Sequence, residues 1–473
     1  MYSVIAILCV IKALTIGISF TQVFVHRHEA ANGRTSCISQ HIMGFNEKKE
    51  VVHQLVPASA SSAQKTKSWR DVVNKSRSLL TLIDLAGHEK YLKTTIAGLT
   101  GCYPDFALVV VGANMGVTKM TKEHLGCVIA LDLPLICVIT KTDIAPDNVL
   151  QQTKKTLVRI LESKGARRKA IEVRSEKDVD TCVANLSSKI CPMFLVSSVN
   201  GTGLEFLYSY LSRLRPLNEM LREQSLTSPV EFSIDETFVV TGVGLILSGT
   251  VLQGTLDTSA ELVMGPFGTG EFKKVQVKSI HCKRTPVEVC TAGNSCAISV
   301  RLVNRREQLR RIDVRRGMVI VDPAINPRSV RRFLAEVLVL HHPTTIKLGY
   351  QAVIHCGIIR QTATMTRILR DEFLRTGDRA QVEFKFIMRP EYIKPGQVLI
   401  FREGNTKGVG RVVKILEDDE DSAEALAAVS AAAAAAAAAG ALPAVGGVAV
   451  DLAIPAPSAA VDAGVEANPN DTK

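Results

Sequence analysis

The chain has 473 residues and a formal net charge of +11, with 46% hydrophobic and 22% charged residues. A chain of this length is expected to hold two to four domains, and this composition is that of a globular protein. The eleven cysteines include no Cys-x-x-Cys motif, so the pattern excludes a disulfide framework or a cysteine zinc site and favours reduced thiols of a cytosolic protein.

The charge is unevenly distributed along the chain. Residues 417–473 contain ten acidic residues and one basic residue, Lys473, so this segment carries −9 and residues 1–416 carry +20. A body this basic suggests a polyanionic partner such as RNA, although basic charge alone discriminates poorly between functions. The acidic run, nine consecutive alanines at 431–439 and Gly/Pro/Ala/Val repeats predict a disordered tail over 417–473.

The first twenty residues are apolar and carry one charge, Lys12. They lack the basic region and the small-residue cleavage site of a signal peptide. A membrane span is open as an interpretation, but its length is marginal and Lys12 interrupts it.

Two polar stretches follow before the first regular pattern. Spacing alone predicts an exposed loop around Gly33–Ser36, and a short strand at Val51–Leu55. The Ser/Ala/Lys-rich segment Pro57–Lys75 is predicted to be a mobile insertion.

From Leu79 onward, apolar runs alternate with segments of helical spacing. The expected strands cover residues 79–83, 105–112, 134–140 and 192–197, and the expected helices lie near 88–100, 118–131, 147–164 and 202–214. Repeated strand–helix units predict a parallel sheet covered on both faces. In open sheets of this kind, ligands bind beyond the carboxyl ends of the strands.

The segment Leu79–Lys93 carries the strongest motif. Asp84 stands where its strand should stop, followed by Gly87 and His88. An acid at that point can hold a hydrated Mg²⁺, a glycine lets a backbone N–H approach a terminal phosphate, and a histidine can position an attacking water. The simpler alternative is an acidic turn between a strand and a helix.

The next motif, Thr140-Lys141-Thr142-Asp143, closes another strand. The carboxylate of Asp143 can accept two hydrogen bonds from guanine N1–H and N2–H₂, which adenine cannot offer, and the stem of Lys141 can lie along the base. The alternative is that Asp143 is an ordinary helix N-cap. Ser197-Ser198-Val199 follows the last strand and by itself predicts only a turn.

After the polar linker 216–229, the sequence pattern changes to short strands separated by glycine turns. Two β-rich blocks follow, and regular short strands without helical spacing suggest barrels. We interpret Gly242, Gly244 and Gly249 as hairpin glycines rather than a phosphate loop. His341 and His342 have no third ligand at useful spacing, so a structural role is favoured over metal binding.

A cluster of arginines lies between the two β-rich blocks. It is interpreted either as a solvated loop or as a contact to an RNA backbone, with neither favoured. Its members are Arg305, Arg306, Arg310, Arg311, Arg315, Arg316, Arg328, Arg331 and Arg332.

The three strand-end motifs, in this order, resemble those of the translational GTPases of the elongation-factor-Tu family, over about Val23 to Leu416. The run Ile-Asp-Leu-Ala-Gly-His-Glu-Lys-Tyr-Leu-Lys-Thr-Thr is most similar to the GTPBP-type GTP-binding proteins. The resemblance implies an α/β G domain of the P-loop NTPase type, with its first strand missing, followed by two β-barrel domains. The implied limits are 1–22 for an apolar non-homologous segment, 23–215 for the GTP-binding domain, 228–325 for β-barrel domain II, 330–416 for β-barrel domain III and 417–473 for the tail.

The resemblance also implies ligands and residue roles. GTP or GDP and Mg²⁺ are the expected cofactors, and His88 is the expected catalytic, water-positioning residue. Thr35 would ligate Mg²⁺ through its hydroxyl, and Asp84 would do so through water. The implied nucleotide-binding residues are Gly87, Thr140, Lys141, Asp143, Ser197 and Ser198. Threonine at position 140 departs from the commoner asparagine, which implies weaker structural hydrogen bonds there.

One expected part of this family is absent. The dipeptide Gly-Lys occurs nowhere in the chain, so the Gly-x-x-x-x-Gly-Lys-Ser/Thr phosphate loop expected within residues 1–22 is missing. We interpret that segment as a mispredicted start exon or a truncated gene product, beside the membrane interpretation above. Without that loop, little hydrolysis is expected from this chain.

The predicted function is GTP binding and hydrolysis coupled to a conformational switch that acts on RNA or the ribosome in the cytoplasm. An exchange or activating factor is an expected partner, DNA is not, and membrane association is not favoured. The alternative is a pseudo-GTPase that binds RNA or protein through its β-barrels without hydrolysing GTP. A third, less favoured possibility is a membrane-anchored G protein.

Overall fold

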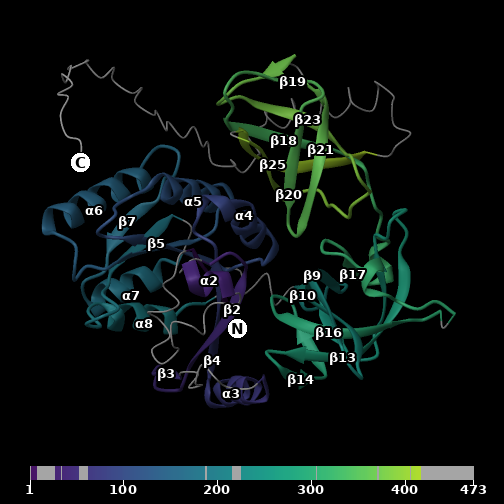
Figure 1. Cartoon of the computed structure of the whole chain (residues 1–473), viewed down its shortest axis with the longest axis horizontal. Coiled ribbons are helices and arrows are strands. Elements are labelled where there is room, and N and C mark those ends of the chain that lie inside the picture. The colour runs from purple at the N-terminus through teal and green to yellow at the C-terminus, as the bar shows by residue number, and fades with distance from the viewer. Residues whose placement is uncertain are drawn as a thin grey trace, which may run out of the picture.

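The computed structural model describes residues 2–7, 27–32, 35–52, 62–186, 189–215, 225–304, 306–369, 372–404 and 406–416. They form an α/β domain and two β-barrels, which Figure 1 shows as three separate bodies. The predicted fold class, a G domain followed by two barrels, is confirmed in this architecture. The predicted tail 417–473 lies outside the described residues.

The α/β domain is built on a sheet of eight strands in the order β3-β2-β4-β1-β5-β6-β8-β7. Strands β2 and β3 form an antiparallel edge, whereas the pairs from β4 to β7 are parallel. The strands are β1 (Tyr2–Ile7), β2 (Ser39–Phe45), β3 (Val51–Val52), β4 (Ser78–Leu85), β5 (Phe106–Gly112), β6 (Leu135–Thr140), β7 (Lys169–Glu172) and β8 (Ile190–Leu195).

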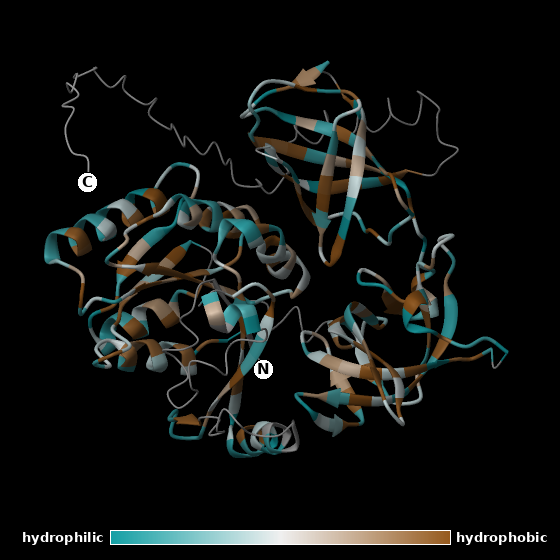
Figure 2. Cartoon of the chain, viewed as in Figure 1, coloured by the Kyte–Doolittle hydropathy of each residue, from teal (hydrophilic) through white to brown (hydrophobic). Residues whose placement is uncertain are grey.

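Helices cover both faces of this sheet because the central strands are apolar on both sides. Leu82 and Leu108 face α7 and α8 in one core, while Leu85 and Val109 face α4, α5 and α6 in another. Figure 2 shows these strands as hydrophobic segments between helices with hydrophilic outer faces. The helices are α2 (Arg27–Asn32), α3 (Ser62–Lys75), α4 (Leu92–Gly101), α5 (Lys119–Ala130), α6 (Asp147–Leu161), α7 (Glu176–Ala184) and α8 (Leu204–Ser212), with a 3-10 turn η2 (Glu89–Tyr91) before α4.

The prediction that the first strand is missing is corrected by β1. Tyr2–Ile7 lies between β4 and β5, with Ala6 opposite Asp84 and Val4 opposite Phe106. Central strands of a sheet that helices cover on both sides read as continuous apolar runs, and a run of this kind resembles a targeting segment in the sequence. Residues 8–26 lie outside the described residues, and so do the interpretations that depend on them. No helix in the described part of the chain is both long and apolar enough to cross a membrane.

The prediction of a mobile insertion at Pro57–Lys75 is also corrected. Ser62–Lys75 forms helix α3, which buries Trp69 and Val72 against Ile42 and Leu79. The helix was missed because its apolar residues are few and cluster in its last two turns, whereas Ser, Lys and Gln dominate the rest. The short strand expected at Val51–Leu55 is described only at Val51–Val52, and β7 and α7 were not predicted.

The first barrel closes through six strands in the order β12-β17-β9-β10-β16-β13, since β12 pairs with β13. Two of its glycines lie at the hairpin as predicted, because Gly242 and Gly244 have positive φ angles of 84° and 97° where β9 turns into β10. The prediction is wrong for Gly249, which lies within β10 at a register shift, where a Cβ atom would meet the Ser233 carbonyl oxygen. The strands of this region are β9 (Glu231–Val240), β10 (Gly244–Gln253), β11 (Thr255–Asp257), β12 (Glu261–Gly265), β13 (Lys273–Cys282), β14 (Thr285–Val287), β15 (Val289–Thr291), β16 (Ser295–Leu302) and β17 (Val319–Val321).

The second barrel is a closed ring in the order β18-β23-β21-β20-β24-β25. Aromatic rings fill it, with Phe333 stacked on Phe384 at 5.4 Å and beside Phe386 at 5.2 Å between ring centroids. The strands of this region are β18 (Arg332–His341), β19 (Ile346–Lys347), β20 (Gln351–Cys356), β21 (Ile359–Ile368), β22 (Phe373–Leu374), β23 (Arg379–Phe386), β24 (Val398–Glu403) and β25 (Thr406–Leu416).

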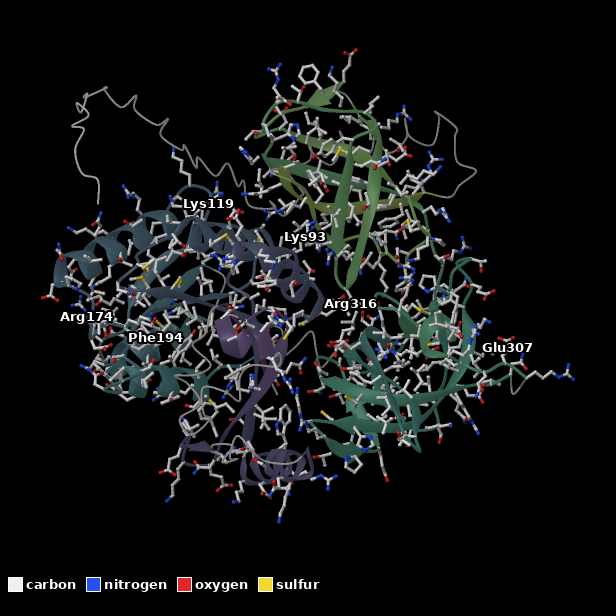
Figure 3. All side chains as sticks on the ribbon, viewed as in Figure 1. Lys93, Lys119, Arg174, Phe194, Glu307 and Arg316 are labelled. Carbon is white, nitrogen blue, oxygen red and sulfur yellow. The ribbon has the colours of Figure 1, made fainter. Side chains whose placement is uncertain are left out.

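Polar contacts join the three bodies. Glu123 of α5 pairs with Lys407 and Arg402 of the second barrel, beside a small apolar cluster that includes Ile96 and Ile400. The α/β domain meets the first barrel where the Arg284 guanidinium lies 4.7 Å from the centre of the Trp69 ring. Figure 3 places Lys93 of α4 and Arg316 of the first barrel where the bodies face one another.

Part of the arginine cluster is internal rather than available to RNA. Arg315 pairs with Glu391 across the two barrels at 2.9 Å, and Arg332 pairs with Glu383 at 2.8 Å. Arg310 is held by Asp313 at 3.0 Å. The exposed members among the described residues are Arg306, Arg310, whose ion pair lies at the surface, Arg311, Arg316 and Arg328.

Buried histidines should make stability depend on pH. Burial lowers the pKa of His124 from 6.5 to about 4, and burial with nearby cations, Arg360 first, lowers that of His355 to about 3. As the pH falls below about 6.5, these histidines bind protons in the unfolded chain but not in the folded chain. The free energy of unfolding is therefore largest above that pH and decreases as the pH falls. Each histidine should contribute a slope of up to about 1.4 kcal/mol per pH unit.

Urea unfolding at pH 7.5 and pH 5 measures this slope. His124→Leu should reduce the pH dependence of the unfolding free energy, whereas His281→Leu, at an exposed position, should leave it unchanged. Equal pH dependence in the wild type and His124→Leu would contradict the assignment.

Candidate functional site

The parallel strands of the sheet end at one common edge. Ile7 is opposite Leu85, Gly112 is opposite Thr140, and Ile139 is opposite Leu195. Because the carboxyl ends of parallel strands meet at the same edge, the motifs that follow β4, β6 and β8 lie on one side of the domain. The predicted site residues are therefore gathered along this edge.

The structure brings together the two residues predicted to hold a metal ion. Asp84, the penultimate residue of β4, is 0% exposed, and Thr35 is 6% exposed. The Thr35 hydroxyl donates a hydrogen bond to Asp84 Oδ2 at 3.0 Å. The antiparallel pairing of Ser39 with Asp84 explains this contact, because it carries the residues before β2 over the end of β4.

The chemistry of this pair fits Mg²⁺, which prefers hydroxyl, carboxylate and water oxygens. No group of three or more His, Cys, Asp or Glu side chains within the described ranges forms a metal site by itself. A cation at Thr35 and Asp84 would therefore take its other ligands from water and from the ligand it accompanies. The phosphate side fits less well, because no Gly-Lys follows β1 or occurs elsewhere in the chain.

A hydrogen bond from helix α4 fixes the turn after β4. The Thr95 hydroxyl of α4 donates to the Ala86 carbonyl, and both residues are buried. This contact fixes the backbone immediately before Gly87, which is half-buried, and His88, which is exposed.

His88 caps the 3-10 turn that follows it. Its Nδ1 accepts a hydrogen bond from the Lys90 N–H at 3.2 Å, and its ring lies 6.3 Å from that of Tyr91. The capping alternative is therefore present in the structure. Capping uses Nδ1 only, and Nε2 makes no hydrogen bond with the described residues.

The Thr140–Asp143 motif forms an exposed turn at the end of β6. Lys141 has a positive φ of 61°, which is costly for a residue with a side chain, and Lys141 and Asp143 are both exposed. Thr140 itself is buried, and its carbonyl accepts a hydrogen bond from Ala113 N–H at 2.8 Å. The backbone therefore presents the charged side chains outward while Thr140 stays within the sheet.

The loop after β8 lies beside this turn. The Thr142 N–H donates to the Val196 carbonyl at 3.5 Å, so two of the predicted motifs are joined by their backbones. Ser197 is buried, and its Oγ accepts hydrogen bonds from the N–H groups of Val199 and Asn200 at 3.2 and 3.4 Å. Ser197 thus organises the loop from within, while Ser198 is exposed.

Two residues at this edge were not in the predicted set. Val199 is 86% exposed, which is unusual for a large apolar side chain. The sequence feature that could have indicated it is its position directly after the two serines of the loop motif. Glu29 of α2 is 1% exposed and accepts hydrogen bonds from Ser36 and Cys37. No sequence pattern indicated Glu29. Burial and the nearby Glu29 carboxylate raise the pKa of Cys37 to about 12.

A family model covers the α/β domain. Residues 22–224 match the model described as the elongation factor Tu GTP binding domain. The match includes Thr35, Asp84, Asp143 and Ser197.

Curated relatives extend the similarity to the barrels. GTP-binding protein 1 of Xenopus laevis is 44% identical over 402 residues, which is 85% of this chain and 59% of that protein. GTP-binding protein 2 of Homo sapiens is 38% identical over 395 residues, which is 83% of this chain and 63% of that protein. The chain therefore spans about three fifths of the length of these relatives.

A solved structure shares the fold. It is the crystal structure of translation elongation factor SelB from Methanococcus maripaludis in complex with the GTP analogue GppNHp, with a TM-score of 0.61 and 16% identity. The likeness covers 89% of this chain and 80% of that chain.

The loop after β8 offers a matched pair of serines for a test. Ser197→Ala should remove the acceptor for two N–H groups and weaken the loop by about 1 kcal/mol, which hydrogen exchange at Val199 and Asn200 measures. Ser198→Ala, at the exposed neighbour, should leave both amides unchanged. Equal exchange in the two variants would show that Ser197 does not hold this loop.

Proposed function

Because the chain belongs to the family of translational GTPases built on the elongation factor Tu GTP-binding domain, we propose that it binds GTP and couples hydrolysis to a conformational switch acting on RNA or the ribosome. The observation that carries this proposal is the convergence of two kinds of group on one sheet edge. One is the buried Thr35–Asp84 pair, and the other is the exposed turn with Lys141 and Asp143.

Guanine recognition is assigned to the loops after β6 and β8. The carboxylate of Asp143 accepts hydrogen bonds from guanine N1–H and N2–H₂, and the stem of Lys141 covers one face of the base. A backbone N–H near Ser198 meets guanine O6. Val199 supplies an apolar surface beside the base, which accounts for an exposed valine at this point. Thr140 and Ser197 support the two loops from within.

The phosphate side is assigned to the segments around β4. Thr35 holds Mg²⁺ through its hydroxyl, and Asp84 does so through water. When bound, the ion neutralises charge on the phosphate oxygens. The Gly87 N–H meets the γ-phosphate, and His88 orients the attacking water through Nε2, the ring nitrogen that its capping contact leaves available.

A second candidate function is favoured by a specific observation. Since the chain contains no Gly-Lys, it lacks the lysine that neutralises phosphate charge in this family. A pseudo-GTPase that binds RNA or protein through its barrels without hydrolysis fits that composition. Measuring GTP affinity and single-turnover hydrolysis on the same protein separates the two, because a pseudo-GTPase gives no hydrolysis at saturating GTP.

The switch and its partners are proposed from the surface. Glu123 of α5 forms ion pairs with the second barrel, and through these pairs a movement at the sheet edge is transmitted to the barrels. The exposed arginines, such as Arg306 and Arg311, suit an RNA backbone. The cytoplasm is the proposed location, in keeping with ten free cysteines among the described residues. An exchange or activating factor completes the proposed set of partners.

The assignment of Asp143 makes a testable prediction about the base. Asp143→Asn should shift preference from GTP toward XTP, because an amide can donate a hydrogen bond where xanthine presents an acceptor. Affinities for fluorescent GTP and XTP measure this on a version of the chain with the phosphate loop restored, with Asp147→Asn, at an exposed position on α6, as the control. Unchanged GTP affinity in Asp143→Asn would sink the assignment.

The role of His88 separates a catalytic residue from a cap. In a version of the chain that carries a Gly-x-x-x-x-Gly-Lys-Ser/Thr loop, and with its activating partner present, His88→Ala should leave GTP affinity within about a factor of three while single-turnover hydrolysis falls by about 10²-fold, since a water-positioning contact acts only in the transition state. His88→Asn supplies a control that retains a side-chain acceptor for capping. If His88 only caps η2, its loss should lower stability and binding together and leave hydrolysis per bound GTP unchanged.

A further inference from the structure

Glu29 is a buried carboxylate at the centre of a small hydrogen-bond cluster. Its Oε1 accepts hydrogen bonds from the Ser36 N–H at 2.6 Å, the Ser36 hydroxyl at 2.6 Å and the Cys37 N–H at 3.2 Å. The side chain is 1% exposed. Three donors therefore converge on one buried oxygen, and bonds of this charge-assisted kind are about twice as strong as neutral ones.

The residue also stands out against the rest of its helix. Arg27, His28, Ala31 and Asn32 are all exposed, so Glu29 is the buried member among the described side chains of α2. A helix attached through a carboxylate rather than an apolar face gains little hydrophobic stabilisation from that contact. The specific hydrogen bonds to Ser36 and Cys37 account for the buried carboxylate better than core packing does.

The cluster lies next to the proposed metal ligands. Ser36 directly follows Thr35, whose hydroxyl donates to Asp84 Oδ2 at 3.0 Å. Residues 35–37 lead into β2, and Figure 1 shows α2 beside that strand. Glu29 therefore accepts a hydrogen bond from the backbone one residue beyond Thr35, while Asp84 accepts one from the Thr35 side chain.

We propose that Glu29 is a positioning residue that holds segment 35–37 so that the Thr35 hydroxyl stays against Asp84. The metal-binding role of Thr35 in this inference rests on the proposed function. By holding this segment, Glu29 reduces the free energy that a bound nucleotide has to supply to order Thr35. Glu29 thereby favours the nucleotide whose extra phosphate shares the metal with Thr35, which is the triphosphate.

The contact itself is tested without nucleotide. Hydrogen exchange of the Ser36 and Cys37 amides should accelerate by at least about tenfold in Glu29→Ala, because both N–H groups lose their acceptor. Glu29→Gln keeps one acceptor oxygen and should be intermediate. Glu47→Ala, at an exposed position after β2, is the matched control and should match the wild type. Unchanged amides of β5 show that the fold is intact.

Nucleotide affinity then distinguishes positioning from a structural role. With Mg²⁺ present, the ratio of affinities for a non-hydrolysable GTP analogue and GDP should fall by at least about tenfold in Glu29→Ala, with GDP affinity unchanged. Faster exchange with an unchanged ratio would overturn the positioning role, and unchanged exchange would overturn the contact. If the wild type binds neither nucleotide, the proposed function fails, and exchange alone decides whether Glu29 holds the segment.

Discussion

Strand β1 joins the two halves of the α/β sheet, because β4 and β5 each pair with β1 in the strand order. On one side of it lie β4, β2 and Asp84, and on the other lie β5, β6 and β8 with the turn around Asp143. The parallel register along β1 places these two groups on one edge. Without this pairing, the two groups would belong to two separate sheets.

The three bodies are held internally and joined to one another by different physical means. Each has an apolar core, such as the phenylalanine rings of the second barrel, which a rearrangement between bodies does not have to break. The contacts between them combine ion pairs, such as Glu123 with Lys407 and Glu391 with Arg315, with small apolar clusters such as the one that holds Ile96 and Ile400. These interfaces are more polar than the three cores, and interfaces of this kind between domains permit relative motion.

The sequence predicted the parts of the site whose chemistry is local. Asp84 and Asp143 follow recognisable strands, so strand ends and motif spacing were enough to place them on one edge. Glu29 was missed because its role depends on a contact with the chain seven residues later, which leaves no periodic pattern. The strand Tyr2–Ile7 was misread because a central strand of such a sheet lacks the alternation of apolar and polar residues that identifies strands. Helix α3 was missed for the opposite reason, since its few apolar residues were hidden among polar ones.

The contact between Trp69 and Arg284 gives the molecule a built-in optical reporter. Trp69 is the single tryptophan of the whole chain, and it is buried on α3 with a guanidinium of the first barrel over its ring. The intrinsic tryptophan emission therefore comes from one position at the boundary between two bodies. A shift in its wavelength or intensity follows the separation of the α/β domain from the first barrel, without any added label.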